Sequence, residues 1–253
     1  MKSLTELYRI GLGPSSSHTM GPRFAAQAFA ADLPEACARV RVTLYGSLAA
    51  TGRGHLTDRA VSEPFAACPV DIVWLPEQVL PRHPNALQFE ALDAAGAVLA
   101  SRVVYSLGGG AILNEGEESG SGREVYPHTC MCDVFAQTED ENQQLWEIVD
   151  QCEGPEIRPF LADIWKAMQR AIERGLNAEG RLPGSLNVPR KASAYHARAQ
   201  SMAGYFGQTA LLFAYALAVS EENAAGGEIV TAPTCGACGV LPAVLYFLKQ
   251  QSN

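Results

Sequence analysis

The spacing of apolar residues changes part-way along the chain, from a period near 2 to a period near 3.6. In residues 38–45, Val40 and Val42 alternate with polar residues, as on a strand that buries one face. After Tyr126 the pattern is helical, and in residues 157–172 apolar side chains recur three and four positions apart. We therefore expect an α+β chain, with an N-terminal α/β domain followed by an all-helical domain.

The same patterns predict individual elements. Strands are expected over residues 38–45, 70–74, 88–94 and 97–106, the last two as a hairpin across a glycine. Helices are expected over residues 21–29, 139–150, 157–172 (ended by Gly175), 192–220 (broken near 204–207) and 240–249. A Gly-Pro breaker predicts a boundary between a domain of residues 1–152 and one of residues 153–253. The last helix is very apolar with no following element to cover it, so the second domain is expected to be incomplete.

Charge and composition exclude some functions. Lys and Arg number 19 against 27 Asp and Glu, and the net charge of −8 argues against binding to nucleic acid or to an anionic membrane surface. The longest apolar run, residues 210–219, is too short to span a bilayer. The first ten residues carry charges and no apolar signal region, and the seven cysteines are an odd number. These features predict a reducing, cytoplasmic location without membrane or nucleic-acid partners.

A hydroxyl-rich segment, GLGPSSSHTMGP, surrounds a histidine near the N-terminus. Hydroxyl side chains flank His18 on both sides, namely Ser15, Ser16, Ser17 and Thr19. Hydroxyls and backbone N–H groups at the start of a helix suit a carboxylate or a phosphate. The alternative is a capping loop in which one Ser or Thr is the N-cap. Because four hydroxyls exceed what one cap needs, an anion site is favoured.

A second histidine follows two glycines in the segment YGSLAATGRGHLTD. Gly52 and Gly54 allow close approach of the backbone. Asp58 lies three residues after His55, and a nearby carboxylate can fix the tautomer of a histidine and raise its basicity. His55 is therefore a candidate base or ligand-binding residue, and the alternative is a structural histidine.

The segment TAPTCGACGVLPAV forms a loop of small residues before the last predicted helix. Its backbone offers a second anion cradle, with Thr231, Thr234 and Gly236 as the contact residues. Residues 223–227, which precede it, are expected to add flexibility. The alternative is an ordinary connection between helices.

Signals for common cofactors are sparse. Residues 106–110, SLGGG, permit close approach of a ligand or of other backbone, or form a plain turn, but they match no nucleotide-binding motif. Pyridoxal phosphate would need a lysine beside a phosphate loop, and the four lysines lie elsewhere. The pairs Cys130/Cys132 and Cys235/Cys238 lack the spacing of a complete structural zinc site. The other cysteines are expected to pack as small side chains: Cys37, Cys68 and Cys152.

Five segments follow one another in a recognisable order. They are GPSSSHTMGP (13–22), LYGSLAATGRGHLTD (44–58), YSLGGG (105–110), GRLPGSLNVPRKAS (180–193) and EENAAGGEIVTAPTCGACGVLPAVL (221–245). Together they resemble the bacterial iron–sulfur L-serine dehydratases over nearly the whole chain. The resemblance implies an N-terminal domain like allosteric substrate-binding domains, joined to a helical catalytic domain. It also implies a cytoplasmic homodimer that converts L-serine to pyruvate and ammonia with a [4Fe-4S] cluster, whose open iron position acts as a Lewis acid.

The resemblance also implies roles for residues. The catalytic residues would be His55, as the base, and His18, with His128 as a further candidate. The substrate-binding residues would be Ser15, Ser16, Ser17, Thr19, Thr231, Thr234 and Gly236. In this family the cysteines that bind the cluster lie further downstream, so no metal ligand is assigned and the chain is expected to be truncated within its catalytic domain. The alternative is a non-catalytic serine-binding fragment without a cluster.

Overall fold

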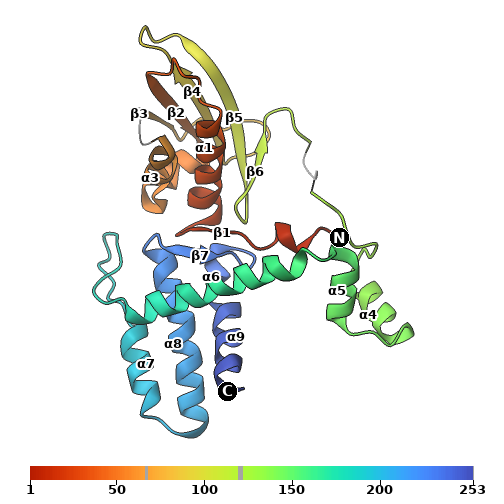
Figure 1. The fold of residues 1–253 in the computed structure, drawn as a ribbon. Coiled ribbons are helices and arrows are strands. Elements are labelled where there is room, and N and C mark those ends of the chain that lie inside the picture. The colour runs from red at the N-terminus through yellow and green to blue at the C-terminus, as the bar shows by residue number, and fades with distance from the viewer. Residues whose placement is uncertain (66–67, 119–121, 253) are drawn as a thin grey trace.

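The structure, a computed structural model, describes residues 1–65, 68–118 and 122–252. The strands are β1 (Ile10–Leu12), β2 (Arg39–Tyr45), β3 (Val70–Leu75), β4 (Ala86–Leu92), β5 (Val98–Gly108), β6 (Ala111–Asn114) and β7 (Glu228–Val230). The α-helices are α1 (Gly21–Ala31), α2 (Gly46–Thr51), α3 (Thr57–Ser62), α4 (Met131–Asp140), α5 (Leu145–Glu153), α6 (Ile157–Asn177), α7 (Ala192–Gln200), α8 (Gly204–Ala224) and α9 (Val240–Gln251). Figure 1 shows a sheet region above a helical region, with β1 and β7 between them. The predicted mixture of helix and sheet, with the sheet in the N-terminal part, is confirmed.

The larger sheet has the strand order β3-β2-β4-β5-β6. Strands β2 and β3 are parallel, with Val40 opposite Val70, and the other neighbours are antiparallel. The predicted strands are confirmed as β2, β3 and the β4–β5 hairpin. The predicted alternation holds only at the start of β2, because Thr43 and Tyr45 in its second half are buried as well. Strand β6 was not predicted, since four residues are too few to show a period.

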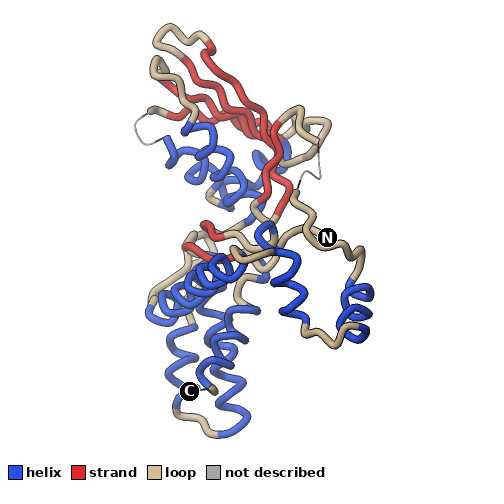
Figure 2. Tube along the Cα trace, turned by 45° about the vertical axis from the view of Figure 1, so that its right-hand side comes forward, coloured by secondary structure: helices blue, strands red, loops and turns tan. Residues whose placement is uncertain are grey.

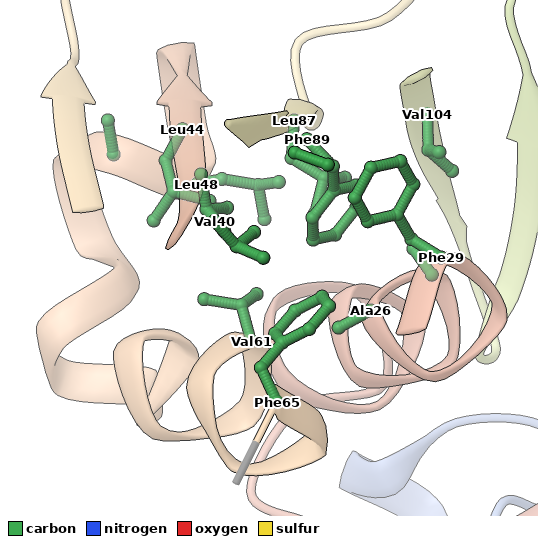
Figure 3. Close-up of a cluster of buried hydrophobic side chains, with 14 residues drawn as sticks. Ala26, Phe29, Val40, Leu44, Leu48, Val61, Phe65, Leu87, Phe89 and Val104 are labelled. Carbon is green, nitrogen blue, oxygen red and sulfur yellow. The ribbon is translucent and has the colours of Figure 1, made fainter. Parts of the chain in front are cut away.

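Helices α1 and α3 cover one face of this sheet (Figure 1), and the tube view shows the same layer of helices against the strands (Figure 2). Phe29 of α1 stacks on Phe89 of β4 with ring centroids 5.3 Å apart, and Phe65 lies edge-on to Phe29 at 6.3 Å (Figure 3). Burial of each such ring stabilises the fold by about 1.5–3 kcal/mol. This core fixes α1 and α3, and the segments before these two helices carry His18 and His55.

In the helical region, α6 crosses α8 near Ala218 and also lies against α7 and α9 (Figure 1). Gly175 was predicted to end α6, but the helix continues to Asn177. A Cβ at Gly175 would lie well inside van der Waals distance of the Ala218 carbonyl of α8. The glycine is therefore required by close packing of two helices, and the prediction of a helix end there was wrong.

Two further helix predictions need correction. The single helix predicted over residues 139–150 is instead a pair, α4 and α5, joined by a turn in which Asn142 has φ of +51°. The break predicted near residues 204–207 lies at residues 201–203, and Gly207 is inside α8. Gly207 is needed there because a Cβ would collide with the Met202 carbonyl.

The N-terminal segment ties the two regions together. Strand β1 pairs antiparallel with β7, Ile10 lying opposite Val230. The Glu153 carboxylate at the end of α5 accepts hydrogen bonds of 2.6 Å from both Ser3 Oγ and Leu4 N. Burial favours the neutral acid, but the hydrogen bonds from Ser3, Leu4 and Tyr126 outweigh it and lower the pKa of Glu153. The β1–β7 pairing was not predicted, because strands of three residues carry no periodic signal.

Candidate active site

The hydroxyl-rich segment forms a single wide helical turn, Ser16–Met20, that runs directly into α1. Ser15 is the N-cap of this turn, and its Oγ accepts a hydrogen bond from the backbone N–H of His18 at 3.1 Å. One hydroxyl is therefore used as an ordinary cap, as the alternative interpretation held. Ser16 is buried, and the hydroxyls of Ser17 and Thr19 have partners at the histidines.

The structure brings His18 and His55 together. Their ring centroids lie 4.8 Å apart with the planes tilted by 38°. Thr19 Oγ1 donates to the His55 carbonyl at 2.5 Å, and Thr57 Oγ1 donates to the His18 carbonyl at 2.6 Å. Each histidine segment thus donates a hydrogen bond to the histidine carbonyl of the other segment. These two hydrogen bonds keep the two rings next to each other.

The tautomer of His55 follows from its hydrogen bond. Nδ1 lies 3.1 Å from the carbonyl oxygen of Thr51, one turn earlier in the chain. Because a carbonyl only accepts, Nδ1 must carry the proton, and Nε2 of the neutral ring keeps its lone pair. Sequence reasoning assigned this orienting role to Asp58. That expectation was wrong, since the backbone of Thr51 supplies the acceptor.

His18 is held between two serine hydroxyls. Nδ1 is 2.9 Å from Ser17 Oγ, and Nε2 is 2.9 Å from Ser47 Oγ at the start of α2. Burial and then the neighbouring His55 lower the pKa of His18 below its ordinary value, and the backbone of Ser47 partly opposes them. His18 is therefore neutral near pH 7, with one ring nitrogen donating and the other accepting.

Two hydrogen bonds join the helical region to the loop that precedes the histidine turn. Asn223 Nδ2 donates to the Pro14 carbonyl at 3.2 Å, and Gly13 N donates to the Gly227 carbonyl at 3.0 Å. A Cβ at Gly13 would collide with the Asn223 backbone and side-chain oxygens. Sequence reasoning assigned only flexibility to residues 223–227 and missed Asn223. The one signal was a polar residue beside small ones, and in the structure it lies in the last turn of α8.

Two buried glutamates hold α8, the helix that contains Asn223, in place. Glu222 forms ion pairs with Arg174 at 3.1 Å and with Arg190 at 2.9 Å. Glu221 accepts a 2.6 Å hydrogen bond from the backbone N–H of Lys191, at the start of α7. The segment EEN therefore anchors α8 to α6 and α7 and holds the Pro14 loop.

The loop that follows β7 mixes buried and exposed residues. The Thr231 side chain is inaccessible, and its Oγ1 accepts a hydrogen bond from Arg9 N at 3.0 Å. Thr234 and Gly236 are exposed. The Thr231 hydroxyl thus has a partner in the β1–β7 junction, whereas the other two predicted contact residues are open to solvent.

Buried sulfur atoms connect this loop to the histidine turn. Met20, two residues after His18, packs in one cluster with Cys235 and Cys238. Burial raises the pKa of each of these thiols to about 12, so both stay protonated near pH 7. They pack as small apolar groups.

The glycines of residues 106–110 allow two loops to approach. Gly109 and Gly110 have φ of +58° and +83°. A Cβ at Gly109 would lie 3.3 Å from the Pro233 carbonyl oxygen, and one at Gly110 would lie 3.0 Å from Met20 Sδ. The predicted close approach to other backbone is confirmed, and it brings a third motif next to the histidine turn.

A narrow cleft borders this turn on the side of Thr19. Its charged lining residues are Arg23, Arg59 and Glu63. Glu63 forms ion pairs with Arg23 Nη1, at 2.5 Å, and with Arg59. The hydrogen bond from Arg59, followed by the one from Arg23, lowers the pKa of the Glu63 carboxyl. Two guanidinium groups facing one carboxylate leave one positive charge in excess, which suits an anion such as a substrate carboxylate. Sequence reasoning did not single out these residues.

The remaining candidate ligands do not assemble into a metal site. His128 lies before α4, with Nε2 2.7 Å from Gln137 Oε1, and Cys130 and Cys132 are exposed beside it. Within the described ranges, no three His, Cys, Asp or Glu side chains come together as metal ligands. The residues that the structure describes therefore do not fit a [4Fe-4S] cluster, which needs several thiolates at one point.

Comparison with known protein families decides the relationship. The family model described as serine dehydratase beta chain matches residues 3–69 and 63–117, and the one described as serine dehydratase alpha chain matches residues 93–253. This chain belongs to the serine dehydratase family. The resemblance seen in the five sequence motifs is thereby confirmed.

Curated members of the serine dehydratase family match nearly all of the chain. L-serine dehydratase 1 of Escherichia coli is 36% identical over 98% of this chain and 66% of its own length. L-serine dehydratase of Streptomyces coelicolor is 36% identical over 97% and 65%, and that of Helicobacter pylori is 32% identical over 98% and 66%. The chain spans about two thirds of the length of these relatives. The 300 aligned positions with the first relative exceed the 253 residues of the chain by 47, so that relative has internal residues without a counterpart here.

Proposed function

We propose that this chain acts on L-serine as a dehydratase, a lyase that forms pyruvate and ammonia, with His55 removing the proton from Cα. The observation that carries the proposal is the hydrogen bond from His55 Nδ1 to the Thr51 carbonyl. It leaves Nε2 as the basic atom of a partly exposed ring, which is what a general base needs. Relatives named L-serine dehydratase at 32–36% identity support the choice of substrate.

His18 would assist by staying neutral beside the base. When His55 takes a proton it becomes a cation, and a second cation 4.8 Å away would oppose this step. The lowered pKa of His18 avoids that repulsion. The hydroxyls of Ser17 and Ser47 hold the His18 ring, which we propose forms one wall of the substrate pocket.

The substrate carboxylate needs donors or positive charge. We propose that the turn of Ser15, Ser16, Ser17 and Thr19 and the exposed residues Thr234 and Gly236 border the substrate, with Thr231 fixing the second loop. The excess positive charge of Arg23 and Arg59 over Glu63 favours arrival of the carboxylate from that side.

Dehydration also requires that hydroxide leave from Cβ. The family implies an iron–sulfur cofactor for this purpose, but the described residues do not fit one. The proposal for this chain's own residues is therefore limited to binding serine and removing its Cα proton. The same observation favours a second candidate, a serine-binding chain without catalysis.

One experiment separates the two candidates. The chain is incubated anaerobically with ferrous iron and sulfide, and pyruvate release from L-serine is measured beside serine binding by calorimetry. Catalysis predicts pyruvate release that falls about 100-fold or more in His55→Gln. The matched control His196→Gln, in the helical region next to Tyr215, should retain activity. Saturable binding without pyruvate would select the second candidate, and absence of both would contradict the proposed function.

The wider organisation is proposed on the same family basis. We propose that residues 1–152 form a domain like allosteric substrate-binding domains and that residues 153–253 belong to the helical catalytic domain. A homodimer and a cytoplasmic location are proposed with it. In the part of the chain that the structure describes, no helix combines the length and apolar character needed to cross a membrane. Limited proteolysis and gel filtration test the boundary and the dimer.

A further inference from the structure

Two thiols lie together at the edge of the sheet region, away from the histidine pair. Cys37 precedes β2 and Cys68 precedes β3, and their Sγ atoms are 3.8 Å apart. Both residues are partly exposed. Because β2 and β3 are parallel neighbours, the two strands begin side by side, and Val40 N donates to the Pro69 carbonyl at 2.9 Å. The backbone thus holds the two sulfur atoms near each other.

We propose that Cys37 and Cys68 form a reversible disulfide by exchange with a small-molecule disulfide. One protein thiolate attacks the reagent, releasing one small thiol and leaving a mixed disulfide. The second protein thiolate then attacks the protein sulfur of that mixed disulfide and releases the other small thiol. Two protein thiols are oxidised to one disulfide, and one reagent disulfide is reduced to two thiols.

The geometry favours closure of the protein disulfide over persistence of the mixed one. An S–S bond is about 2.05 Å long, so the sulfur atoms must approach by less than 2 Å from their present separation of 3.8 Å. Burial and the neighbouring Cys37 raise the pKa of the Cys68 thiol. Exchange should therefore be slow near pH 7 and accelerate toward pH 9, because the thiolate is the attacking species.

The bond would close residues 37–68 into a ring that contains β2, α2 and α3. Restricting the unfolded chain in this way stabilises the folded state.

Peptide mapping tests the proposal on the full chain. The protein is treated with oxidised glutathione at pH 8.5, the remaining thiols are blocked, and a tryptic digest is analysed without reduction. The proposal predicts that peptides 24–39 and 60–82 are joined by a disulfide, and that dithiothreitol separates them. The link must be absent from Cys37→Ser and from Cys68→Ser. It must persist in the matched control Cys130→Ser/Cys132→Ser, which removes two exposed thiols.

Thermal melting supplies the second readout. The oxidised chain should melt about 5 °C or more above the reduced chain, and the difference should vanish in Cys37→Ser. Free thiols or stable mixed disulfides at positions 37 and 68, after Cys130 and Cys132 have reacted, would overturn the proposal. A 37–68 link that leaves the melting temperature unchanged would overturn its stabilising role.

Discussion

Two loops rich in glycine and proline meet in this protein, and they differ in what they expose. The first loop, residues 11–22, contains the histidine turn Ser16–Met20 and places His18 beside His55, where both imidazoles stay partly accessible among hydroxyls and carbonyls. The loop around Cys235 and Cys238 buries both of its thiols, with pKa values of about 12. Similar composition therefore produces opposite chemistry, because burial decides which titratable group can exchange a proton near pH 7.

The comparison assigns the two loops different tasks. Groups that can change protonation lie in the sheet region, at His18 and His55. The helical region contributes packing through Cys235 and Cys238, which cluster with Met20 of the histidine turn, and a hydrogen bond through Asn223. Accessible titratable rings and packing support are thus separated between the two regions, and each prediction below tests this separation, from the largest effect to the smallest.

Alkylation of the thiols should show the largest effect. At pH 8 a thiol with a pKa of about 12 has a very small thiolate fraction, so Cys235 and Cys238 should react with iodoacetamide about 1,000-fold or more slowly than N-acetylcysteine. The exposed Cys130 and Cys132 should be labelled first in the same sample. Mass spectrometry follows each site with time. Labelling of all four at similar rates would show that the second loop is open and would break the comparison.

Disturbing the close contact between the sheet region and the helical region should have the next largest effect. In Gly13→Ala the new methyl group meets the Asn223 oxygens, and the backbone on one side must move. We expect a loss of about 2–4 kcal/mol in the free energy of unfolding, measured in urea. The control is Gly54→Ala, because a Cβ there meets nothing within 4 Å and should change stability little. Equal stability of the two variants would contradict the close packing of this turn on α8.

The hydrogen bond from Asn223 should contribute less. Asn223→Ala removes the donor to the Pro14 carbonyl and should lower the free energy of unfolding by about 1 kcal/mol. Asn177→Ala is the matched control, since Asn177 donates to the Glu173 carbonyl within its own helix and is exposed. If the control loses as much stability as Asn223→Ala, the support assigned to Asn223 does not exist.

The sequence predicted the elements whose patterns are long and local. Strands β2 to β5, the long helix α6 and the family itself followed from periodicity and motifs. The pairing of β1 with β7 could not be predicted, because two strands of three residues lie more than 200 positions apart and have no period of their own. Gly175 was misassigned because a glycine that packs against a neighbouring helix looks like one that ends a helix.

The candidate site was predicted in its residue types but not in its contacts. The sequence identified His18, His55 and their hydroxyl neighbours, and the structure places the two rings together. It did not identify the Thr51 carbonyl as the partner of His55, because backbone acceptors carry no sequence signature. Asn223 was missed for a related reason: its partner is also a carbonyl, that of Pro14, far away in the chain.

The titration of His18 provides the smallest and most specific effect. Its pKa lies below the ordinary value of 6.5, so the unfolded state binds more protons in that interval, and stability falls as the pH drops from 6.5 toward the folded pKa. His55→Gln should raise the pKa of His18, because it removes the neighbouring imidazole whose charge lowers that pKa. Titration of the His18 ring signals by NMR measures the shift, and a His18 pKa that stays the same or falls in His55→Gln would contradict the described environment.

The protonated nitrogen of His55 tests the central claim most directly. Two-dimensional NMR of the 15N-labelled chain at pH 8 distinguishes the two ring nitrogens by their chemical shifts. The structure predicts a neutral ring with the proton on Nδ1 and the lone pair on Nε2, because Nδ1 donates to the Thr51 carbonyl. A ring with its proton on Nε2 would lack a free basic atom at that position, and His55 could not serve as the base proposed here.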